Sequence, residues 1–285
     1  MSQVNKKTIN VRGELIDLST PLVMGILNRT PDSFYAESRV TSLDAVIERV
    51  GIMQQEGASI IDIGGYSTRP GAEEISFAQE IERIESVIGP LRKNFPDLII
   101  SIDTFRSEVA KRAVEQGADI INDVAGGILD ESMFDMVAML GVPYILMHMR
   151  GTPETMNMLT EYNNVVVDVI KDLKSKIDLL RQKGVTDILL DPGFGFAKNI
   201  PQNFQLLANL SEFHQLGYPL LVGLSRKATI YKTLGINAGE ALNGTSVLNT
   251  IALQNGASIL RVHDVKPAAE AVKLWMATQP MEKKE

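Results

Sequence analysis

The sequence of 285 residues contains no cysteine, and this absence excludes several kinds of chemistry. Disulfide bonds, thiolate nucleophiles and cysteine-ligated zinc all need a sulfur atom that the chain does not supply. The first residues, MSQVNKKTINVRG, contain no apolar run of the kind found in secretory signals. No apolar stretch approaches the roughly 20 residues that a membrane-spanning helix needs. We therefore expect a cytoplasmic protein without a membrane partner.

The chain also lacks an excess of basic residues, since its net charge is −7. A mildly acidic surface argues against sequence-independent binding to DNA or RNA, because it repels their phosphates. An anionic small substrate stays compatible with this charge, because basic residues in a cleft can outweigh it locally. Hydrophobic residues make up 45% of the chain, which is ample for a large core. We expect small-molecule substrates and no nucleic-acid partner.

Short apolar runs alternate with longer amphipathic stretches along the whole chain. The runs are rich in β-branched residues and apolar on both faces, as strands buried in a parallel sheet are. The stretches between them repeat apolar residues at helical spacing. The predicted strands are Leu22–Leu27, Ser59–Ile63, Leu98–Ile102, Ala118–Ile121, Val142–Met147, Asp187–Leu190, Pro219–Gly223 and Ser258–Val262. The predicted helices are Leu43–Gln55, Ile75–Ile88, Arg106–Gln116, Glu131–Leu140, Asn163–Lys183, Asn203–Leu210, Ala241–Asn255 and Ala268–Ala277.

This alternation predicts an α/β fold, a single (β/α)8 TIM barrel, with an open doubly wound sheet as the alternative. Several predicted helices end in glycine before the next strand, which is a common helix stop signal. The segment Thr8–Leu18 alternates around Arg12 and Gly13, and it predicts an N-terminal β-hairpin that caps the barrel bottom. We predict one domain over residues 1–285, with this hairpin within 1–20 and a frayed tail over 279–285.

Polar or glycine-rich sequence follows each predicted strand. The carboxyl ends of the strands carry the chemistry in (β/α)8 barrels. One such residue is weak evidence, because Asp and Asn also cap helices and form turns. A polar group at the same place in every strand predicts a shared pocket. These positions hold Asn28, Asp62 with Gly64 and Gly65, Asp103 with Thr104, Asn122 with Asp123, His148, Asp191, Ser225 with Arg226 and Lys227, and Arg261 with His263.

The polar residues of this predicted pocket suit a heterocycle that carries several N–H groups. Asp103, Asn122 and Asp191 supply two carboxylates and an amide. A carboxylate pairs with a guanidine-like ring edge through two parallel hydrogen bonds. The three side chains therefore predict recognition of a ring rich in hydrogen-bond donors.

Basic residues in the same predicted pocket suit an anion. Arg69, Lys227, Arg261 and His263 supply positive charge. Asn28 offers a hard oxygen ligand for Mg²⁺, which commonly combines few protein ligands with substrate phosphate oxygens. The pocket therefore predicts a heterocycle, a phosphate group and magnesium. A Schiff base on Lys227 is the alternative chemistry for an aldolase.

Some polar residues in these segments have structural interpretations. His148 is interpreted as structural support despite its place at a strand end, and Arg226 as a structural neighbour of Lys227. Gly193 and Gly195 suggest a phosphate cradle, but the chain has no G-x-x-x-x-G-K-[ST] pattern, so a P-loop is not expected.

The chain resembles the dihydropteroate synthase family over nearly its whole length, from Pro21 to about Val265. The resemblance is specific because several independent motifs occur in the expected order. The motifs are GILNRTPDSF (Gly25–Phe34), DIGGYSTRPGA (Asp62–Ala72), SIDT (Ser101–Thr104), INDVAGG (Ile121–Gly127), HMRGTPETM (His148–Met156), LDPGFGFAK (Leu190–Lys198), GLSRK (Gly223–Lys227) and RVHDV (Arg261–Val265).

The resemblance implies a homodimeric (β/α)8 barrel that acts in folate synthesis and is a target of sulfonamide drugs. It implies a transferase that condenses 6-hydroxymethyl-7,8-dihydropterin diphosphate with p-aminobenzoate to give 7,8-dihydropteroate and pyrophosphate. A pterin-binding methyltransferase that serves a corrinoid is the runner-up, but it would not need the SRK and RVH motifs for a pyrophosphate. A non-catalytic pterin-binding barrel is a further alternative, and it would be expected to lose Asn28, Arg261 or His263.

The resemblance also implies roles for individual residues. The implied pterin ligands are Asp103, Asn122, Asp191 and Lys227, with Met147 as a candidate lining residue. The implied pyrophosphate ligands are Asn28, which acts through Mg²⁺, with Thr68, Arg69, Arg261 and His263. The implied p-aminobenzoate contacts are Phe34, Pro70 and Phe196, against the helix that starts after Lys227. The implied catalytic residues are Asp103, Lys227, Arg261 and His263.

Three residues depart from the usual pattern of the family. Arg29 stands where an apolar residue is usual, and Tyr66 where an acidic or small residue is frequent. Ala228 stands where a serine typically contacts the carboxylate of p-aminobenzoate. Backbone N–H groups at a helix N-terminus are an alternative means of binding that carboxylate.

Overall fold

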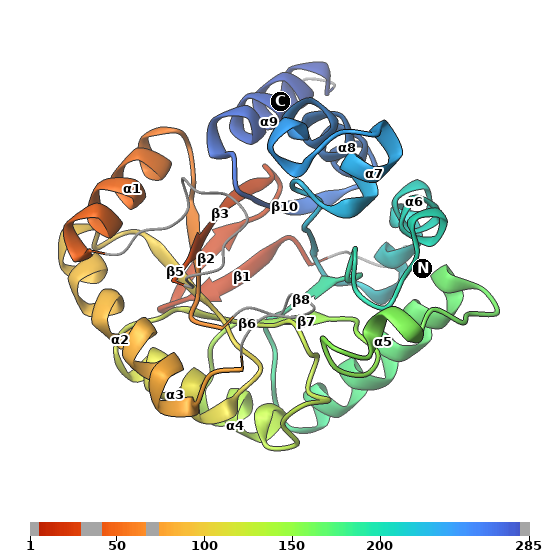
Figure 1. Ribbon diagram of the computed structural model, residues 1–285. Helices are drawn as coiled ribbons and strands as arrows, with labels where there is room; N and C mark the ends of the chain where they lie inside the picture. Colours follow the sequence, from red (N-terminus) through yellow and green to blue (C-terminus); the bar gives the residue numbers. More distant parts are fainter. Residues whose placement is uncertain (1–5, 30–41, 67–73, 280–285) are drawn as a thin grey trace, which may run out of the picture.

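A closed barrel of eight parallel strands forms the centre of the computed structural model, which describes residues 6–29, 42–66 and 74–279 (Figure 1). The strands follow one another around the barrel in the order β10-β3-β4-β5-β6-β7-β8-β9. They are β3 (Leu22–Asn28), β4 (Ile60–Gly64), β5 (Ile99–Asp103), β6 (Ile120–Asp123), β7 (Tyr144–Met147), β8 (Ile188–Asp191), β9 (Leu220–Val222) and β10 (Ala257–Val262). The predicted TIM barrel is confirmed, and the open doubly wound sheet is excluded.

Helices surround this barrel, as Figure 1 shows. They are α1 (Leu43–Gln55), α2 (Phe77–Asn94), α3 (Ser107–Glu115), α4 (Met133–Leu140), α5 (Val165–Gln182), α6 (Ile200–Ala208), α7 (Ala228–Leu234), α8 (Leu242–Gln254) and α9 (Val265–Thr278). Short 3₁₀ segments cover Met156–Met158, Leu210–Leu216 and Ala238–Glu240. No helix in the described ranges is both long and apolar enough to cross a membrane.

Three predicted helix boundaries that lie close to a proline were wrong. The prediction started two helices after Pro201 and Pro267, whereas α6 begins at Ile200 and α9 at Val265. Proline is tolerated in the first turn because the N–H groups there have no partner within the helix. The helix predicted to stop at Ile88 continues through Pro90 to Asn94, and the fully buried Leu91 packs into the core beyond the proline.

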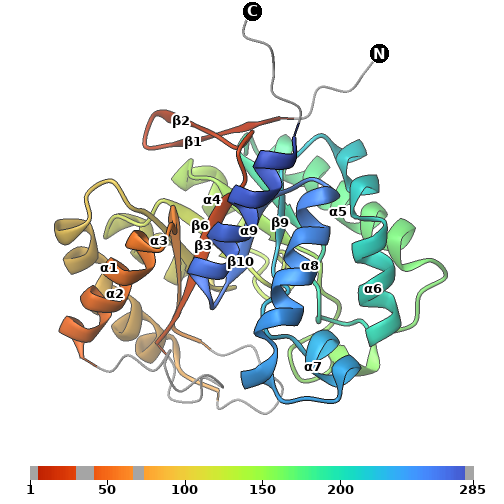
Figure 2. The ribbon, with the colours of Figure 1, turned by 90° about the horizontal axis from the view of Figure 1, so that it is seen from above.

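The predicted N-terminal hairpin is confirmed. Strand β1 (Thr8–Val11) pairs antiparallel with β2 (Glu14–Asp17), and the turn places Arg12 at φ 53° and Gly13 at φ 86°. Positive φ at both turn residues gives the hairpin a twist that matches its strands. Figure 2 shows the hairpin at one end of the barrel and α7 at the opposite end.

The hairpin closes the amino-terminal end of the barrel with apolar side chains. Ile9, Val11 and Leu18 pack against a ring of one apolar residue from every barrel strand. That ring consists of Met24, Ile60, Ile99, Ile120, Ile145, Leu189, Leu221 and Ile259. The bottom layer of the barrel interior is therefore a packed core. Of the tail predicted for 279–285, only Gln279 lies within the described residues.

Candidate active site

The next layer of the barrel interior, towards the carboxyl ends of the strands, is polar. Side chains alternate along a strand, so residues two positions beyond the apolar ring face the same interior. In five strands these residues are polar and are buried or half-buried: Asp62, Ser101, Asn122, Asp191 and Arg261. Several polar residues that the sequence analysis placed after the strands are in fact the last residues of those strands. A polar side chain does not prevent the backbone from pairing with the next strand.

Arg261 joins two carboxylates across the barrel. Its Nε donates to Oδ2 of Asp62 over 2.6 Å, and a terminal nitrogen donates to Oδ2 of Asp103 over 2.6 Å. Charge-assisted bonds of this length are among the strong hydrogen bonds of proteins. The two carboxylates raise the pKa of the guanidinium further above its ordinary value, so Arg261 remains charged.

Asp103 and Asn122 lie side by side in the sheet, since they are register partners of β5 and β6. Burial raises the pKa of Asp103 to about 7, with Arg261 opposing that shift and Asp62 adding to it. Asn122 is 2% exposed, and its Nδ2 donates to Oδ2 of Asp62 over 3.0 Å. Asp62 is therefore the common partner of two predicted site residues.

Asp191 ends β8 at the start of a tight turn. Its Oδ1 accepts from the N–H of Gly193 over 2.7 Å, and its carbonyl accepts from the N–H of His148 over 2.9 Å. Gly193 has φ 73°, and a Cβ there would lie 2.0 Å from the His148 carbonyl oxygen. The backbone can make this turn only with glycine. Burial raises the pKa of Asp191, and the charge of Lys227 opposes the shift.

Lys227 lies over the β8–α6 loop. Its Nζ donates to the carbonyl of Phe194 and is 4.8 Å from the centre of the Phe196 ring. A Cβ on Gly195 would lie 3.2 Å from its Cδ, so this glycine allows the lysine to approach. Burial lowers the pKa of Lys227 to about 8, with Asp191 opposing the shift.

Arg226 holds Lys227 in place, which agrees with its structural interpretation. Arg226 has φ 53°, and its guanidinium makes two hydrogen bonds to Asp264, over 2.8 and 2.9 Å. The same group donates to the carbonyls of Ala238 and Gly239. Helix α7 then starts at Ala228, one residue after Lys227. The sequence pattern did not predict this helix, although the family resemblance implied it.

His263 follows β10 and contacts Ser225. Its backbone N–H donates to the Ser225 Oγ over 3.1 Å, and its Nδ1 lies 3.1 Å from the same oxygen. A serine hydroxyl has one proton and two lone pairs, so it can accept from the N–H group and still pair with Nδ1 in either tautomer of the ring. Ser225 is 3% exposed, and the sequence alone gave it no partner.

Asn28 is the last residue of β3 and pairs with Gly64. A Cβ on Gly64 would lie 3.4 Å from Oδ1 of Asn28 and 3.8 Å from Oδ2 of Asp103, so glycine leaves space between two oxygen donors. No three His, Asp or Glu side chains in the described ranges group as metal ligands. An amide oxygen beside a carboxylate fits a hard cation that takes its other ligands from substrate and water.

His148 is fully buried beside Lys198, which fits its interpretation as structural support. The Lys198 Nζ lies 3.0 Å from His148 Nδ1, and it donates to the carbonyls of Gly193 and Phe196, over 2.9 Å each. Burial, together with the nearby charge of Lys198, lowers the pKa of His148 and keeps its ring neutral. The pair therefore fixes the shape of the loop that carries Phe196.

An apolar patch flanks the polar layer. Met147 belongs to it, so its position is consistent with lining a pocket, and Phe196 packs against it. The buried members are Val124, Ala125, Met147, Met149, Met156 and Ala197. Of the residues implied by the resemblance, Phe34, Thr68, Arg69 and Pro70 lie outside the described residues.

Tyr66 belongs to a cluster that sequence reasoning missed. Its ring meets Phe105 edge-on at 5.1 Å, and the Arg106 guanidinium lies 5.1 Å from the centre of the Tyr66 ring. Arg106 also pairs with the fully buried Glu80 over 2.9 Å. Arg106 and Tyr66 carry no common motif, so only their packing shows the connection.

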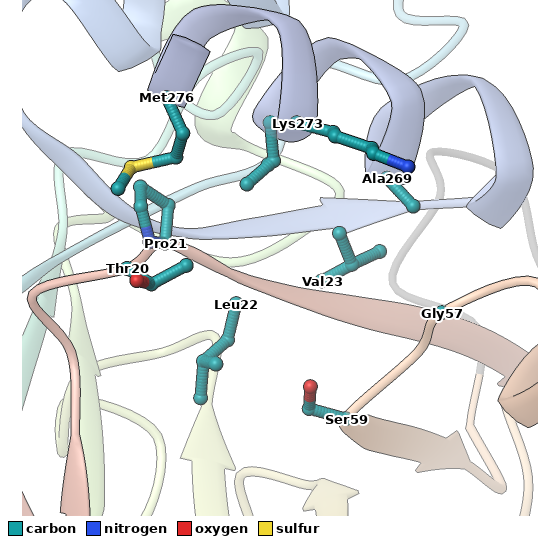
Figure 3. Close-up of a pocket in the computed structure, with 10 residues that line it drawn as sticks. Thr20, Pro21, Leu22, Val23, Gly57, Ser59, Ala269, Lys273 and Met276 are labelled. Atoms are coloured by element: carbon teal, nitrogen blue, oxygen red, sulfur yellow. The ribbon is translucent and has the colours of Figure 1, made fainter. Parts of the chain in front are cut away.

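A cavity of about 410 Å³ lies away from this polar layer, between the start of β3 and α9 (Figure 3). Its lining residues are Thr20, Pro21, Leu22, Val23, Gly57, Ser59, Ala269, Val272, Lys273 and Met276. Lys273 is the single charged residue among them, and it is exposed. The cavity contains none of the predicted site residues.

Comparison with known proteins gives a consistent match. The family model for pterin binding enzymes matches residues 24–263. The chain is 42% identical to dihydropteroate synthase of Escherichia coli (strain K12) over 269 residues, covering 94% of this chain and 95% of the relative.

Solved structures agree with the sequence match. A Yersinia pestis dihydropteroate synthase with a sulfonamide drug complex superimposes with a TM-score of 0.91 at 40% identity, covering 95% of this chain and 98% of that one. A Xanthomonas albilineans dihydropteroate synthase with 4-aminobenzoic acid gives a TM-score of 0.88 at 38% identity, covering 97% and 99%.

Proposed function

The chain belongs to the pterin-binding enzyme family, as one of its dihydropteroate synthases, and we propose how its residues divide the work of that reaction. The enzyme is a transferase of folate biosynthesis. It joins 6-hydroxymethyl-7,8-dihydropterin diphosphate to p-aminobenzoate. The observation that carries the assignment of roles is one hydrogen-bonded set towards the carboxyl ends of β5, β6 and β10. In it Asp62 joins Asn122 to Arg261, and Arg261 also binds Asp103.

The pterin ring binds to Asp103, Asn122, Asp191 and Lys227. Asp103 and Asn122 are adjacent in the sheet, which supports their contacting one edge of a planar ring. Asp191 and Lys227 influence each other's pKa, which supports their acting as a second polar pair. The methionine-rich patch that contains Met147 offers the ring an apolar face.

The diphosphate binds near Arg261 and His263, together with Thr68 and Arg69 from the segment outside the described residues. Asn28 holds Mg²⁺ through its amide oxygen, and the space beside Gly64 supports this assignment. When bound, the magnesium ion neutralises charge that builds up on the leaving diphosphate. The permanent charge of Arg261, on the strand next to that of Asn28, supports the same task.

The reaction breaks the C–O bond between the pterin methyl carbon and the diphosphate, whose oxygen keeps the electron pair. Positive charge then develops on the carbon and spreads into the ring. The Asp103 carboxylate stabilises this charge better than a neutral group would. The arylamine nitrogen donates its lone pair to the carbon and loses a proton to water or to the departing diphosphate. Asp103, Lys227, Arg261 and His263 are the proposed catalytic residues.

The arylamine binds beside Phe196, with Phe34 and Pro70 from the segments outside the described residues. The Lys227 ammonium lies close to the Phe196 ring, which supports a binding position between this loop and α7. The Xanthomonas albilineans neighbour was solved with 4-aminobenzoic acid, which supports the same substrate here. Ala228 supplies no hydroxyl, so the carboxylate of the substrate has to use other donors.

We further propose that the enzyme works in the cytoplasm as a homodimer. Exposed apolar side chains on two adjacent helices support a surface that a second copy covers. Val247 of α8 is 50% exposed and Leu274 of α9 is 71% exposed. Sedimentation equilibrium should give a mass of about twice the 31.3 kDa of the chain.

The function is tested by incubating the protein with the pterin diphosphate, Mg²⁺ and p-aminobenzoate and measuring dihydropteroate. We expect Asp103→Asn to lower kcat by about 100-fold with an unchanged circular dichroism spectrum, because the charge that stabilises the cation is lost. We expect Lys227→Ala to weaken pterin binding. The absence of product under conditions where the Escherichia coli relative turns over would refute the function. Near-normal turnover of Asp103→Asn would refute its role.

A further inference from the structure

Asp62 is a fully buried carboxylate whose hydrogen-bond partners come from three other strands. Oδ2 accepts from Arg261 of β10 and Asn122 of β6, and Oδ1 accepts from Ser101 of β5 over 2.6 Å. We infer that Asp62 is a positioning residue that orients Arg261 and Asn122 for the pterin diphosphate. This inference rests on the roles proposed above for those two residues.

Asp62 controls how the Arg261 guanidinium is shared. The planar fork of an arginine favours two parallel hydrogen bonds with one carboxylate. Here Nε is bound to Asp62, so Asp103 receives one hydrogen bond from a terminal nitrogen. Without Asp62, the fork would be free to take both oxygens of Asp103. Asp62 therefore keeps part of the Asp103 carboxylate available to the ring and keeps the guanidinium from turning away.

Asp62 also decides which end of the Asn122 amide faces the ligand. The amide donates from Nδ2 to Asp62, so Oδ1 is turned the other way. A carboxylate accepts and never donates when ionised, so it selects this orientation over the flipped one. Asn122 then presents a hydrogen-bond acceptor beside Asp103, and both match a ring edge that carries N–H groups.

Both oxygens of Asp62 are used within the barrel, and the side chain is 0% exposed. It therefore acts through its neighbours and does not contact the substrate. This distinguishes its expected effect from that of Asp103. Loss of Asp62 should change how the pterin diphosphate binds and reacts, and it should leave the affinity for p-aminobenzoate unchanged.

The first test replaces Asp62 by an isosteric neutral residue. We expect Asp62→Asn to lower kcat/KM for the pterin diphosphate by about tenfold or more, as loss of a charged hydrogen-bond partner does. The KM for p-aminobenzoate should not change. Isothermal titration should show weaker binding of both 6-hydroxymethylpterin, which reports on Asn122, and inorganic pyrophosphate, which reports on Arg261. An equal change in the KM of both substrates, or none in either, would overturn the inference.

Two further variants separate positioning from folding. Asp62→Glu keeps the buried charge but moves the carboxylate by one methylene, so it should lose pterin affinity even where the protein is folded. Wild-type kinetics in Asp62→Glu would mean that only the charge matters. Ser101→Ala is the matched control, because it removes the third hydrogen bond of Asp62 and leaves those to Arg261 and Asn122. Its kcat/KM for the pterin diphosphate should fall much less than that of Asp62→Asn, and an equal fall would overturn action through Arg261 and Asn122.

A double-mutant cycle tests whether Asp62 acts through Arg261. Arg261→Lys keeps the positive charge but loses the fork, so it cannot bridge the two carboxylates in the same way. We expect Asp62→Asn to cost much less pyrophosphate affinity in the Arg261→Lys background than in the wild type. The same loss in both backgrounds would overturn action through Arg261. Failure of the wild-type assay would refute the proposed function itself, so the two failures are distinguishable.

Discussion

At the scale of single residues, Lys227 is poised to respond to pH. Burial brings the pKa of its ammonium down to about 8, so a moderate rise in pH removes its charge. Asp191 opposes this shift, and the lysine lies over the loop that carries Phe196. Below pH 8 the protonated lysine can donate to the pterin, and above it the neutral amine donates less well.

We therefore predict that kcat/KM for the pterin diphosphate falls as the pH rises through about 8. This constant reports the ionisation of groups in the free enzyme. Lys227→Arg should lower the rate, because the guanidinium fits the space over Gly195 less well, but it should remove the alkaline fall, because arginine stays protonated. Steady-state rates from pH 6 to 10 measure both profiles.

The control is that the wild type and Lys227→Arg are assayed with the same pterin diphosphate. Ionisation of this substrate then affects both pH profiles equally. An alkaline fall of equal midpoint in the wild type and in Lys227→Arg would assign it to another group. Circular dichroism at each pH separates loss of activity from loss of fold.

The sequence predicted where the polar residues of the barrel interior lie better than it predicted the hydrogen bonds between them. Asn28, Asp103, Asn122 and Asp191 were found because a polar residue ends an otherwise apolar run. Asp62 was placed in the same predicted pocket, but it lies inside its apolar run, two residues before the strand ends, and the pattern assigned it no ligand. Ser101 lies two residues before Asp103, so side-chain alternation places it on the same interior face. Asp62 is the register partner of Ser101 and therefore faces the interior too. Their hydrogen bonds could not be predicted from one strand at a time.

At the scale of elements, the β8–α6 loop positions three groups of the site together. Asp191 precedes it and Phe196 lies within it. Lys198 donates hydrogen bonds to the carbonyls of Gly193 and Phe196 in this loop, and its Nζ also contacts His148. Gly193 is where this loop comes close to the carbonyl of His148, the residue after β7. The loop depends on that glycine for its shape.

We predict that Gly193→Ala destabilises the protein strongly and weakens pterin binding. The left-handed conformation alone costs an alanine about 1–2 kcal/mol. The new Cβ would also lie 2.0 Å from the His148 carbonyl, so the backbone must move and release Asp191 from its bond to the Gly193 N–H. This overpacking should add roughly 1–3 kcal/mol to the loss. Urea unfolding and pterin titration measure the two effects.

Gly141→Ala is the matched control for this prediction. Gly141 also has positive φ, at 65°, but a Cβ there would meet nothing within 4 Å. Its loss of stability should therefore be limited to the backbone strain, with pterin affinity unchanged. Equal effects of the two substitutions would show that the close approach to His148 has no influence.

The predicted helices were confirmed where the apolar pattern extends over many residues. Errors occurred mainly at helix boundaries near proline and at one short helix. Five of the eight barrel strands end one or two residues later than predicted, because the residues that follow the apolar run continue the backbone pairing. The apolar pattern did not predict helix α7, because only two of its seven residues, Thr229 and Ile230, are buried. Near Pro90, Pro201 and Pro267 the helices extend beyond the predicted boundaries.

At the scale of the whole molecule, the barrel separates stability from chemistry along its axis. Its amino-terminal end is filled by the apolar ring and closed by the hairpin, while the polar layer lies towards the other end. Polar contacts also fasten the hairpin to the barrel. Arg12 donates to the carbonyl of Pro96 over 2.8 Å, and Lys6 pairs with Asp187 over 2.6 Å.

We predict that truncation of the hairpin core lowers stability without changing catalysis. Ile9 is 0% exposed and packs into the apolar ring, so Ile9→Ala should reduce the free energy of unfolding by about 2–5 kcal/mol. Leu15→Ala on the same hairpin should change it by less than about 0.5 kcal/mol, because Leu15 is 71% exposed. Both variants should keep wild-type kcat/KM for the two substrates at a temperature where they are folded. Urea unfolding and steady-state assays measure the pair. A loss of kcat/KM in folded Ile9→Ala would mean that the hairpin influences the polar layer, and the two ends of the barrel would then be coupled.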